Sequence, residues 1–597
     1  MSIAPMCRVT ICGPLVEKDA ILEALQGLGV LHAVPLKAPD PLTPIDAAGR
    51  RRAEMAFRHI SEAPEQLRIY RKGAPFDVDA VIAEITANRL KLKQLSDRRD
   101  ALVARIADVS DWGEFRFPEP AALGGQRFWF YCVPVRQRTA LAALALPWAI
   151  VGRAPDRLFV VVIAPDEPPA DLLPVPRIHM GAKPLNELRD ELEAIEIEIE
   201  RTGAERGELT RWRLLLAEDL AAAEDRDARK ALAAETLDCE ALFAIAGWAP
   251  QASRPQIERF ADESRAAVVF DSPGEDDRPP TLLQTADPRF GAGSDLTNFY
   301  TTPAYRSWDP SFIVLVSFAI FFAMITADAG YALVIGLITA FYWKRMGATA
   351  NGRRFRIMLA MITVACLIYG VMAGSYFGVA PRKGSFLAAM APIDITSFDA
   401  MMKLSVLIGA VHVGIALAMA TWRKRSSLAA LGSGGWILVI AGGLAMWLGE
   451  GVLKAVGPLL LVAGFCAVFV GGAAGRKVTG PKDWLLKTVD GLMGLTSVTK
   501  LFGDILSYLR LFALGLASAS LATTFNTMAT GVDLARPGLG LLMSILILAF
   551  GHTINFVIGI MGGVVHGLRL NYIEFFGWGL PDEGYPFSAF AKKEIRE

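Results

Sequence analysis

Apolar and polar residues divide this chain near residue 300. Up to that point Glu, Arg and Asp are frequent, whereas from Pro310 onward long apolar runs carry few charges. Long runs with few charges are typical of membrane-spanning helices, and mixed charged and apolar stretches are typical of water-exposed structure. The pattern predicts a soluble part over residues 1–300, followed by a membrane part over residues 301–597.

The soluble part alternates short strand-like and helical stretches. A helical pattern at 17–29, ended by a glycine, lies between two strand-like stretches, and four further strand-like stretches follow. The six expected strands cover 8–12, 30–36, 127–135, 158–164, 242–248 and 266–270. We expect a turn at GWAP (247–250), between the last two. The simplest interpretation is two small α/β lobes.

Two long charged helices with heptad spacing are expected between these strands, at about 78–110 and 184–235. The first seam is Val81, Ile85, Asn88, Leu92, Leu95, Arg99, Leu102, Ile106 and Val109, and the second is Leu185, Leu188, Leu192, Ile195, Ile199, Thr202, Arg206 and Leu209, continued by Leu216 and Leu220. Such a/d patterns predict a coiled coil. One arm precedes the middle lobe and the other follows it, which favours an antiparallel strut, and the second arm would span roughly 60 Å. Dimerisation through the heptads is the alternative.

The membrane part contains seven apolar runs, of which the first is too long for one helix. They cover about 310–343, 355–379, 403–421, 428–447, 454–472, 500–530 and 538–568. Asp328-Ala329-Gly330 interrupts the first run, which predicts a tight hairpin of two helices. Eight spans then place every basic loop on the side of the soluble part, as the positive-inside rule requires. These basic groups are Lys344, Arg345, Arg353, Arg354 and Arg356; Arg423, Lys424 and Arg425; Arg476, Lys477, Lys482 and Lys487; and Lys592 and Lys593.

The sixth run, 500–530, carries a charge in a position that is unfavourable inside a bilayer. Arg510 lies in its middle, and a charge at that depth costs about 2.5–3.5 kcal/mol on insertion scales, so it indicates a function. Ser507 shares the face of Arg510 with Gly503, Ala513, Ala517 and Thr524, and small residues there leave room for another helix. Asp504 and Ser518 lie in the same run.

The last run carries a second polar stripe. His552, Asn555, Gly559, Gly562, His566 and Arg569 recur at three- and four-residue steps and so line one face, with Glu574 just beyond. A stripe of this length favours a functional interpretation over packing. Hydrogen bonds at helix ends and turns explain Asp328, Asp504 and His412 at least as well as a transport role.

Composition excludes several other classes. With 61 Lys+Arg against 61 Asp+Glu the chain lacks the basic footprint of a nucleic-acid-binding protein. Its mean hydropathy of +0.36 is high for a soluble protein. The first fifteen residues lack the basic-then-apolar layout of a secretory signal. The six cysteines show no CxxC spacing, so no metal site is expected.

Several motifs resemble one family. SYLRLFALGLA (507–517) is similar to the arginine helix of the V-type ATPase subunit called I in prokaryotes and a in eukaryotes. GHTIN (551–555) and HGLRLNYIEFF (566–576) resemble that family's final helix, and DP (309–310), DAGY (328–331) and GWAP (247–250) also match. The resemblance runs from end to end. Two departures are Ser518, where eukaryotic relatives have a histidine, and Gly559, near their acidic residue.

The resemblance implies an α-helical membrane protein with a cytoplasmic α/β and coiled-coil arm, acting as the stator of a rotary V-type ATPase in a prokaryotic plasma membrane. Its partners would be a ring of hairpin proteolipid subunits, E/G-type peripheral stalk subunits, a d/C-type rotor adaptor and the lipid bilayer. Arg510 and Arg569 would serve ion translocation; Ser507, Ser518, His552, Asn555, His566, Glu574 and Asp504 are candidates to line the half-channels.

No catalytic ATP site and no cofactor are expected in this chain. Its nearest approach to a phosphate-binding loop, residues 475–480, is followed by Pro481 instead of Lys and Ser or Thr. A secondary transporter would explain polar late helices but not the long arms. A membrane-anchored coiled-coil scaffold would explain the arms but not Arg510.

Overall fold

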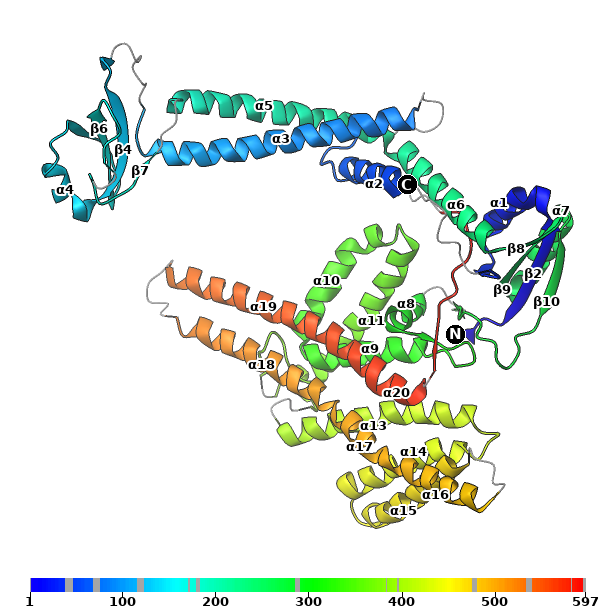
Figure 1. Cartoon of the computed structure of the whole chain (residues 1–597). Coiled ribbons are helices and arrows are strands. Elements are labelled where there is room, and N and C mark those ends of the chain that lie inside the picture. The colour runs from blue at the N-terminus through cyan, green and yellow to red at the C-terminus, as the bar shows by residue number, and fades with distance from the viewer. Residues whose placement is uncertain are drawn as a thin grey trace. The chain divides into compact units, whose positions relative to one another are not determined.

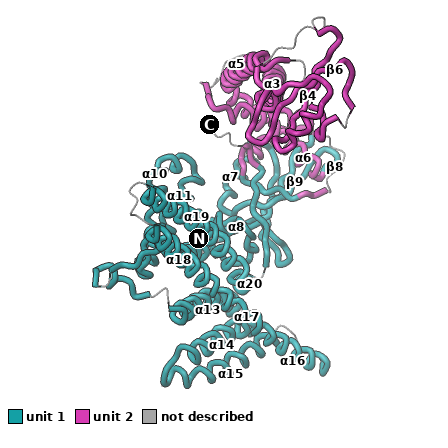
Figure 2. Tube along the Cα trace, turned by 90° about the vertical axis from the view of Figure 1, so that its left-hand side faces the viewer, with its two compact units in different colours: residues 1–15, 30–34, 238–590 teal, residues 16–29, 35–237, 591–597 magenta. Residues whose placement is uncertain are grey.

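The computed structural model describes residues 2–37, 47–67, 76–114, 123–169, 172–178, 183–284, 290–382, 384–393, 397–474, 480–532, 539–580 and 582–593. It contains two compact units (Figure 2). The first comprises residues 1–15, 30–34 and 238–590, and the second comprises 16–29, 35–237 and 591–597. This division follows the contacts within the fold. The boundary predicted at residue 300 separates a soluble from a membrane environment, and it stays a prediction. The stretch 475–479, with Arg476 and Lys477, lies outside the described residues.

The first unit includes an antiparallel sheet ordered β10-β2-β9-β3. The strands are β2 (Met6–Pro14), β3 (His32–Val34), β9 (Leu242–Pro250) and β10 (Ala267–Asp271). All four form at the expected stretches, but the turn expected at GWAP (247–250) is wrong, because β9 continues to Pro250. Gly247 serves close strand pairing instead: a Cβ there would lie 2.5 Å from the carbonyl oxygen of His32.

Smaller elements complete this part of the first unit. They are β1 (Ser2–Ile3), α7 (Arg254–Glu263), β11 (Leu283–Gln284), α8 (Gly291–Tyr300), β12 (Thr302–Pro303) and β13 (Glu583–Gly584). The strand β13, near the end of the chain, pairs antiparallel with β12. The polar segment after the last long helix is therefore held against the segment that precedes the membrane part.

Most residues of the long apolar runs in the membrane part are helical (Figure 1). Its helices are α9 (Ser311–Thr326), α10 (Ala329–Met346), α11 (Ala350–Met372), α12 (Phe386–Ala389), α13 (Phe398–Arg423), α14 (Ala430–Leu448), α15 (Val452–Ala473), α16 (Pro481–Thr496), α17 (Val498–Leu506), α18 (Leu509–Thr530), α19 (Leu539–Arg569) and α20 (Phe576–Gly579). Within the described ranges, six helical segments are long and apolar enough to cross a membrane, and α9 is a shorter apolar helix. The count of eight spans stays a prediction.

The first apolar run breaks where the sequence predicts. Ala327 adopts a left-handed conformation with φ 47°, and the Asp328 side chain caps α10 by accepting hydrogen bonds from the backbone of Gly330 and Tyr331. Both flanking helices are fully described, and each packs against α11 instead of along the other. The break therefore redirects the chain without forming a closely packed hairpin.

A core of large buried side chains joins α9, α13, α14 and the helices after residue 498. Phe321, Val413, Trp436, Tyr508 and Leu511 belong to it and are each at most 5% exposed. Tyr508 lies beside the predicted functional arginine, so the backbone around Arg510 is held by the core.

The second unit holds two long helices that lie side by side, α3 (Val78–Ser110) and α5 (Leu185–Leu209) (Figure 1). Arg98 pairs with Glu191, Lys91 with Glu198, and Asn88 donates to the carbonyl of Thr202. Residue numbers rise along one helix as they fall along the other, so the two run antiparallel. Asp77 caps the start of α3 with its carboxylate.

The second expected arm is not one continuous helix. A 3-10 turn at Thr210–Trp212 separates α5 from α6 (Arg213–Glu235). The Thr210 hydroxyl, which donates to the carbonyl of Gly207, also accepts a hydrogen bond from the backbone of Leu67. Helix α2 (Ala47–Ser61), which the sequence patterns did not suggest, packs on both α3 and α6.

A second antiparallel sheet, ordered β5-β6-β4-β7, lies in the same unit. It comprises β4 (Arg127–Pro134), β5 (Trp148–Arg153), β6 (Arg157–Ala164) and β7 (Arg177–Ile178); the unit's other elements are α1 (Lys18–Leu28), α4 (Thr139–Ala142) and the start of β8 (Leu237–Cys239). Gly29 ends α1 in a left-handed conformation with φ 64°, which confirms the predicted glycine stop.

Candidate functional site

The candidate site lies where two interrupted helices meet. Between α17 and α18 the helix breaks at Ser507 and Tyr508, and the amide of Arg510 bonds the carbonyl of Ser507, three residues back. On the other side α19 passes into a π-helical turn, Leu570–Phe575. Such interruptions are frequent at functional sites because they re-aim side chains.

A chain of hydrogen bonds links the two interruptions. Arg510 Nη2 donates to Ser507 Oγ over 2.9 Å, and Ser507 Oγ donates to Glu574 Oε1 over 2.5 Å. Glu574 is 2% exposed. The hydroxyl thus connects a half-buried guanidinium to a buried carboxylate, which joins three predicted site residues in one network.

Several buried polar atoms at this site have no hydrogen-bond partner among the described residues. They are Arg510 Nη1, Glu574 Oε2 and His566 Nδ1. A buried polar group without a partner costs about 1–3 kcal/mol, so a folded protein keeps one where a function uses it. These atoms give the site capacity to bind a polar group from outside the chain.

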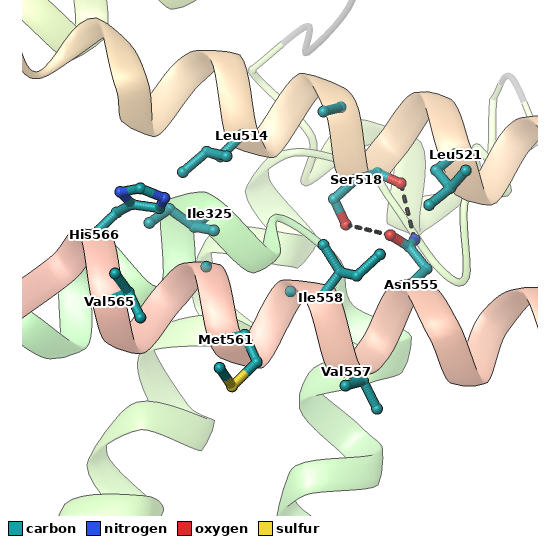
Figure 3. A pocket seen from close by; sticks show the side chains of 13 residues that line it. Ile325, Leu514, Ser518, Leu521, Asn555, Val557, Ile558, Met561, Val565 and His566 are labelled. Atoms are coloured by element: carbon teal, nitrogen blue, oxygen red, sulfur yellow. Dashed lines mark hydrogen bonds between the residues drawn. The ribbon is translucent and has the colours of Figure 1, made fainter.

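A groove of about 390 Å³ runs between α18 and α19, closed on one side by Ile325 of α9. Most of its lining is apolar, with His566 toward one end and the hydrogen-bonded pair Ser518 and Asn555 toward the other (Figure 3). Gly559 also lines it, and a Cβ at this glycine would meet nothing within 4 Å. The space beside Gly559 is therefore open.

A second network lies at the Ser518 end of the groove. Asn555 Nδ2 donates to the carbonyl of Ser518 (2.9 Å) and to the hydroxyl of Tyr331 (3.0 Å). That hydroxyl lies 2.8 Å from Nδ1 of His552, whose Nε2 lies 3.1 Å from Oδ1 of Asn526. If the Tyr331 hydroxyl donates to Nδ1 of His552, then Nε2 of His552 carries a proton and donates to Asn526. Every hydrogen bond of this network then has one donor and one acceptor.

The remaining candidates separate into one exposed residue and three residues with hydrogen-bond partners. Arg569 is exposed at the end of α19, one turn after His566. Asp504 accepts from the indole of Trp578, and His412 bonds the hydroxyl of Tyr508. Asp328 accepts five hydrogen bonds from its surroundings, as described below. The three residues for which helix-end bonding was the alternative therefore all have local partners.

Sequence reasoning missed two members of the second network. Tyr331 follows the helix break at Asp328, and Asn526 lies outside the motif around Arg510. Tyr331 stood within the DAGY motif, yet no periodicity pairs it with α19, 221 positions away. Within the described ranges no group of three or more His, Cys, Asp or Glu could hold a metal ion.

Comparison with known proteins gives a consistent set of relatives. The chain is 28% identical over 390 residues to the A-type ATP synthase subunit I of Methanocaldococcus jannaschii, covering 58% of this chain and 55% of that protein. It is 28% identical over 472 residues to the V-type ATP synthase subunit I of Chlamydia trachomatis, covering 67% and 70%. It is 24% identical over 624 residues to V-type ATP synthase subunit I 1 of Treponema pallidum, covering 96% and 97%.

The match to the archaeal relative spans little more than half of that protein's length. No family model matches the chain. A solved structure of the cytoplasmic N-terminal domain of subunit I, homolog of subunit a, of V-ATPase overlaps 44% of this chain at 19% identity, but its TM-score of 0.24 is too low to carry an argument. On the sequence matches, the chain is similar to subunit I of the A-type and V-type ATP synthases, in one relative over almost its whole length.

Proposed function

We propose that the chain is the membrane-embedded stator of a rotary ATPase, which carries ions past a rotor ring and resists its torque. The observation that carries the proposal is Arg510: a guanidinium in the middle of an apolar run, half-buried beside a groove, with Nη1 unpartnered among the described residues. A charge in such a place marks an ion pathway by default.

The arginine's chemistry suits a barrier between two half-channels. A guanidinium stays charged at every pH a cell offers. An ion-loaded carboxylate of the ring that arrives beside it is favoured in its ionised form and releases its ion. It moves away again only after reloading from the opposite half-channel, so ions cross only when the ring turns. Arg569, one turn from His566, adds positive charge on the same surface.

An unpartnered apolar face next to the groove supports a ring of apolar hairpins as the partner. Phe550, Val557, Ile558, Met561 and Val565 recur along one side of α19 and are 52–66% exposed. Helices of a neighbouring subunit can pack there and bring their carboxylates toward Arg510, while His566, Asn555 and Ser518 supply polar positions along the groove.

The two ends of the site suit opposite half-channels. Ser507, Glu574 and Asp504 lie toward the end of α19 that continues to Lys592 and Lys593 on the basic side. Ser518, Asn555 and His552 lie toward the other end. With eight spans the first set would open to the cytoplasm and the second to the outside.

The antiparallel helices α3 and α5 support a mechanical role for the soluble part. As a coiled-coil strut on the cytoplasmic side, they would hold the small lobes at docking sites on peripheral stalk and rotor-adaptor subunits. We propose a prokaryotic plasma membrane as the location, and no ATP hydrolysis by this chain.

ATP-driven ion uptake into vesicles that contain the purified complex tests the proposal. Arg510→Ala should abolish uptake while the complex still assembles with its ring. Arg345→Ala, at an exposed position at the end of α10, is the matched control and should leave uptake unchanged. Normal uptake by an assembled Arg510→Ala complex would show that the ion path lies elsewhere.

A further inference from the structure

Two cavities lie one after the other among α13, α14, α15 and the α16–α17 pair, and Arg510 lines neither of them. The first, of about 490 Å³, has an almost wholly apolar lining that includes Met402, Val406, Val439, Leu461, Leu501 and Ile505. The second, of about 420 Å³, has a mixed lining that includes Arg423, Lys424, Ser433, Ser497, Trp578 and Asp582. One cavity thus has an apolar lining, and the other combines apolar with charged and polar residues.

The lining positions pass from one cavity to the next along the same helix faces. On α14, on α15 and at the start of α17, a residue of the polar cavity lies within about one turn of a residue of the apolar cavity. These pairs are Trp436 and Ile440 on α14, Val468 and Phe465 on α15, and Ser497 and Val498 at the start of α17. On α13 the same face runs from Ala410 to Leu417 and Arg423. The two cavities therefore lie end to end along these helices, with the basic residues at the far end of the second one.

The polar end is basic. Arg423 is fixed at its mouth, because Nη2 donates to the carbonyl of Arg306 (2.8 Å) and Nη1 to the hydroxyl of Ser307 (3.3 Å). Lys424 is exposed beside it. Among the described residues that line this cavity Asp582 is the one carboxylate, against Arg423 and Lys424, so their charges sum to positive. Lys500 approaches the same rim, with Nζ 3.5 Å from the carbonyl of Gly577.

We propose that this two-part cavity binds one anionic phospholipid, with its phosphate at Arg423 and Lys424 and its acyl chains in the apolar cavity. An amphipathic anion matches both halves, since basic pockets between membrane helices bind anionic headgroups and an apolar groove accepts hydrocarbon. The polar end also lies where the basic loops collect, which places the headgroup at that membrane surface. The inference rests on the membrane position of these helices and not on the proposed ion transport.

The test is native mass spectrometry of the full chain in detergent, titrated with phosphatidylglycerol and, in parallel, with phosphatidylcholine of the same acyl length. We expect a first binding event that favours phosphatidylglycerol. Lys424→Ala should weaken it roughly fivefold, since one basic residue near a lipid surface contributes about that factor. Lys344→Ala, at another exposed lysine at a helix end, should leave it unchanged. Both positions are exposed, so neither change should prevent folding.

A second pair of variants probes the apolar cavity. A Cβ at Gly443, which lines it, would meet nothing within 4 Å, so Gly443→Leu should project into the cavity without a clash and displace the acyl chains. Gly414→Leu, at an equally open helical glycine outside both cavities, is the control. The proposal is overturned if both lipids bind alike, if Lys424→Ala has no effect, if Gly443→Leu binds phosphatidylglycerol as the wild type does, or if inorganic phosphate alone displaces the lipid.

Discussion

Ser507 and Glu574 share a 2.5 Å hydrogen bond that ties the break before α18 to the π-helical turn after α19, although 67 positions separate them in sequence. Because the same hydroxyl accepts from Arg510, its only proton is committed to the carboxylate. Ser507 therefore positions both charged groups at once, and the geometry leaves Arg510 Nη1 free of described partners.

Replacing Ser507 with Ala should remove this link and leave a buried oxygen of Glu574 without its donor. We expect a loss of about 1–3 kcal/mol in the free energy of unfolding and reduced ATP-driven uptake, whereas Ser507→Thr should keep most of both. Thermal unfolding of the purified complex and vesicle uptake measure the two effects. Ser520→Ala, at an exposed position on α18, should change stability by no more than about 0.5 kcal/mol; equal loss in both Ala variants would contradict the assignment.

Tyr331 and Asn555 should act as one unit. The Tyr331 hydroxyl accepts from Asn555 and lies beside His552, so Tyr331→Phe and Asn555→Leu each interrupt the same network. A double-mutant cycle on thermal unfolding should give a coupling energy of about 0.5–3 kcal/mol. In the uptake assay Tyr331→Phe should slow transport with the ring still bound. Strict additivity would mean that the network has no cooperative role.

Asp328 should prove structural and not transporting. Its carboxylate, 3% exposed, accepts from the backbone of Gly330 and Tyr331. It also accepts hydrogen bonds from the hydroxyl of Ser375 and from the backbone amides of Phe377 and Gly378, in the segment after α11. We expect Asp328→Ala to destabilise the chain by about 3 kcal/mol or more.

Uptake distinguishes the two roles of Asp328. When normalised to the amount of assembled complex, transport by Asp328→Ala should stay close to normal. Asp399→Ala is the control, since Asp399 is exposed and pairs with Lys403 four residues on, an interaction worth about 0.5 kcal/mol or less. A block of transport in fully assembled Asp328→Ala complex would contradict the structural role.

Acid should loosen α2 from α3. Burial lowers the pKa of His59 below its ordinary value of 6.5, although its hydrogen bond to Asn88 acts in the opposite direction. His59 therefore takes up a proton more readily in the unfolded segment than in the folded one. Its contribution to stability is fully present above pH 6.5 and is lost as the pH falls through that value toward the lower pKa of the folded state.

Hydrogen exchange can measure this loss, with rates corrected for the intrinsic effect of pH. Protection of the α2 amides should be lower at pH 5.5 than at pH 7.5. His59→Gln keeps a donor toward Asn88 without a titrating group and should remove most of the difference. The same pH dependence in His59→Gln would assign the effect to another group.

Local patterns were sufficient for much of the fold. Period-two stretches placed β2, β4, β6 and β9, Gly29 ended α1, and Asp328 broke the first apolar run as expected. Errors arose where a local signal served a distant contact. Gly247 resembled a turn residue, but it lies within a strand, where its missing side chain leaves room for the backbone of His32. The heptad pattern continues past Thr210, although the helix breaks there and Thr210 bonds the backbone of Leu67.

For the candidate site, the sequence by itself determined which residues are out of place in a bilayer: Arg510 in an apolar run, and the stripe from His552 to Arg569. The cost of burying charge is a property of each residue and its neighbours, so it can be read without coordinates. The tertiary structure alone decided which of them meet. Ser507 contacts Glu574, and Tyr331 contacts His552, only because helix breaks and crossing helices bring remote positions together, and no periodicity along the chain encodes such pairings.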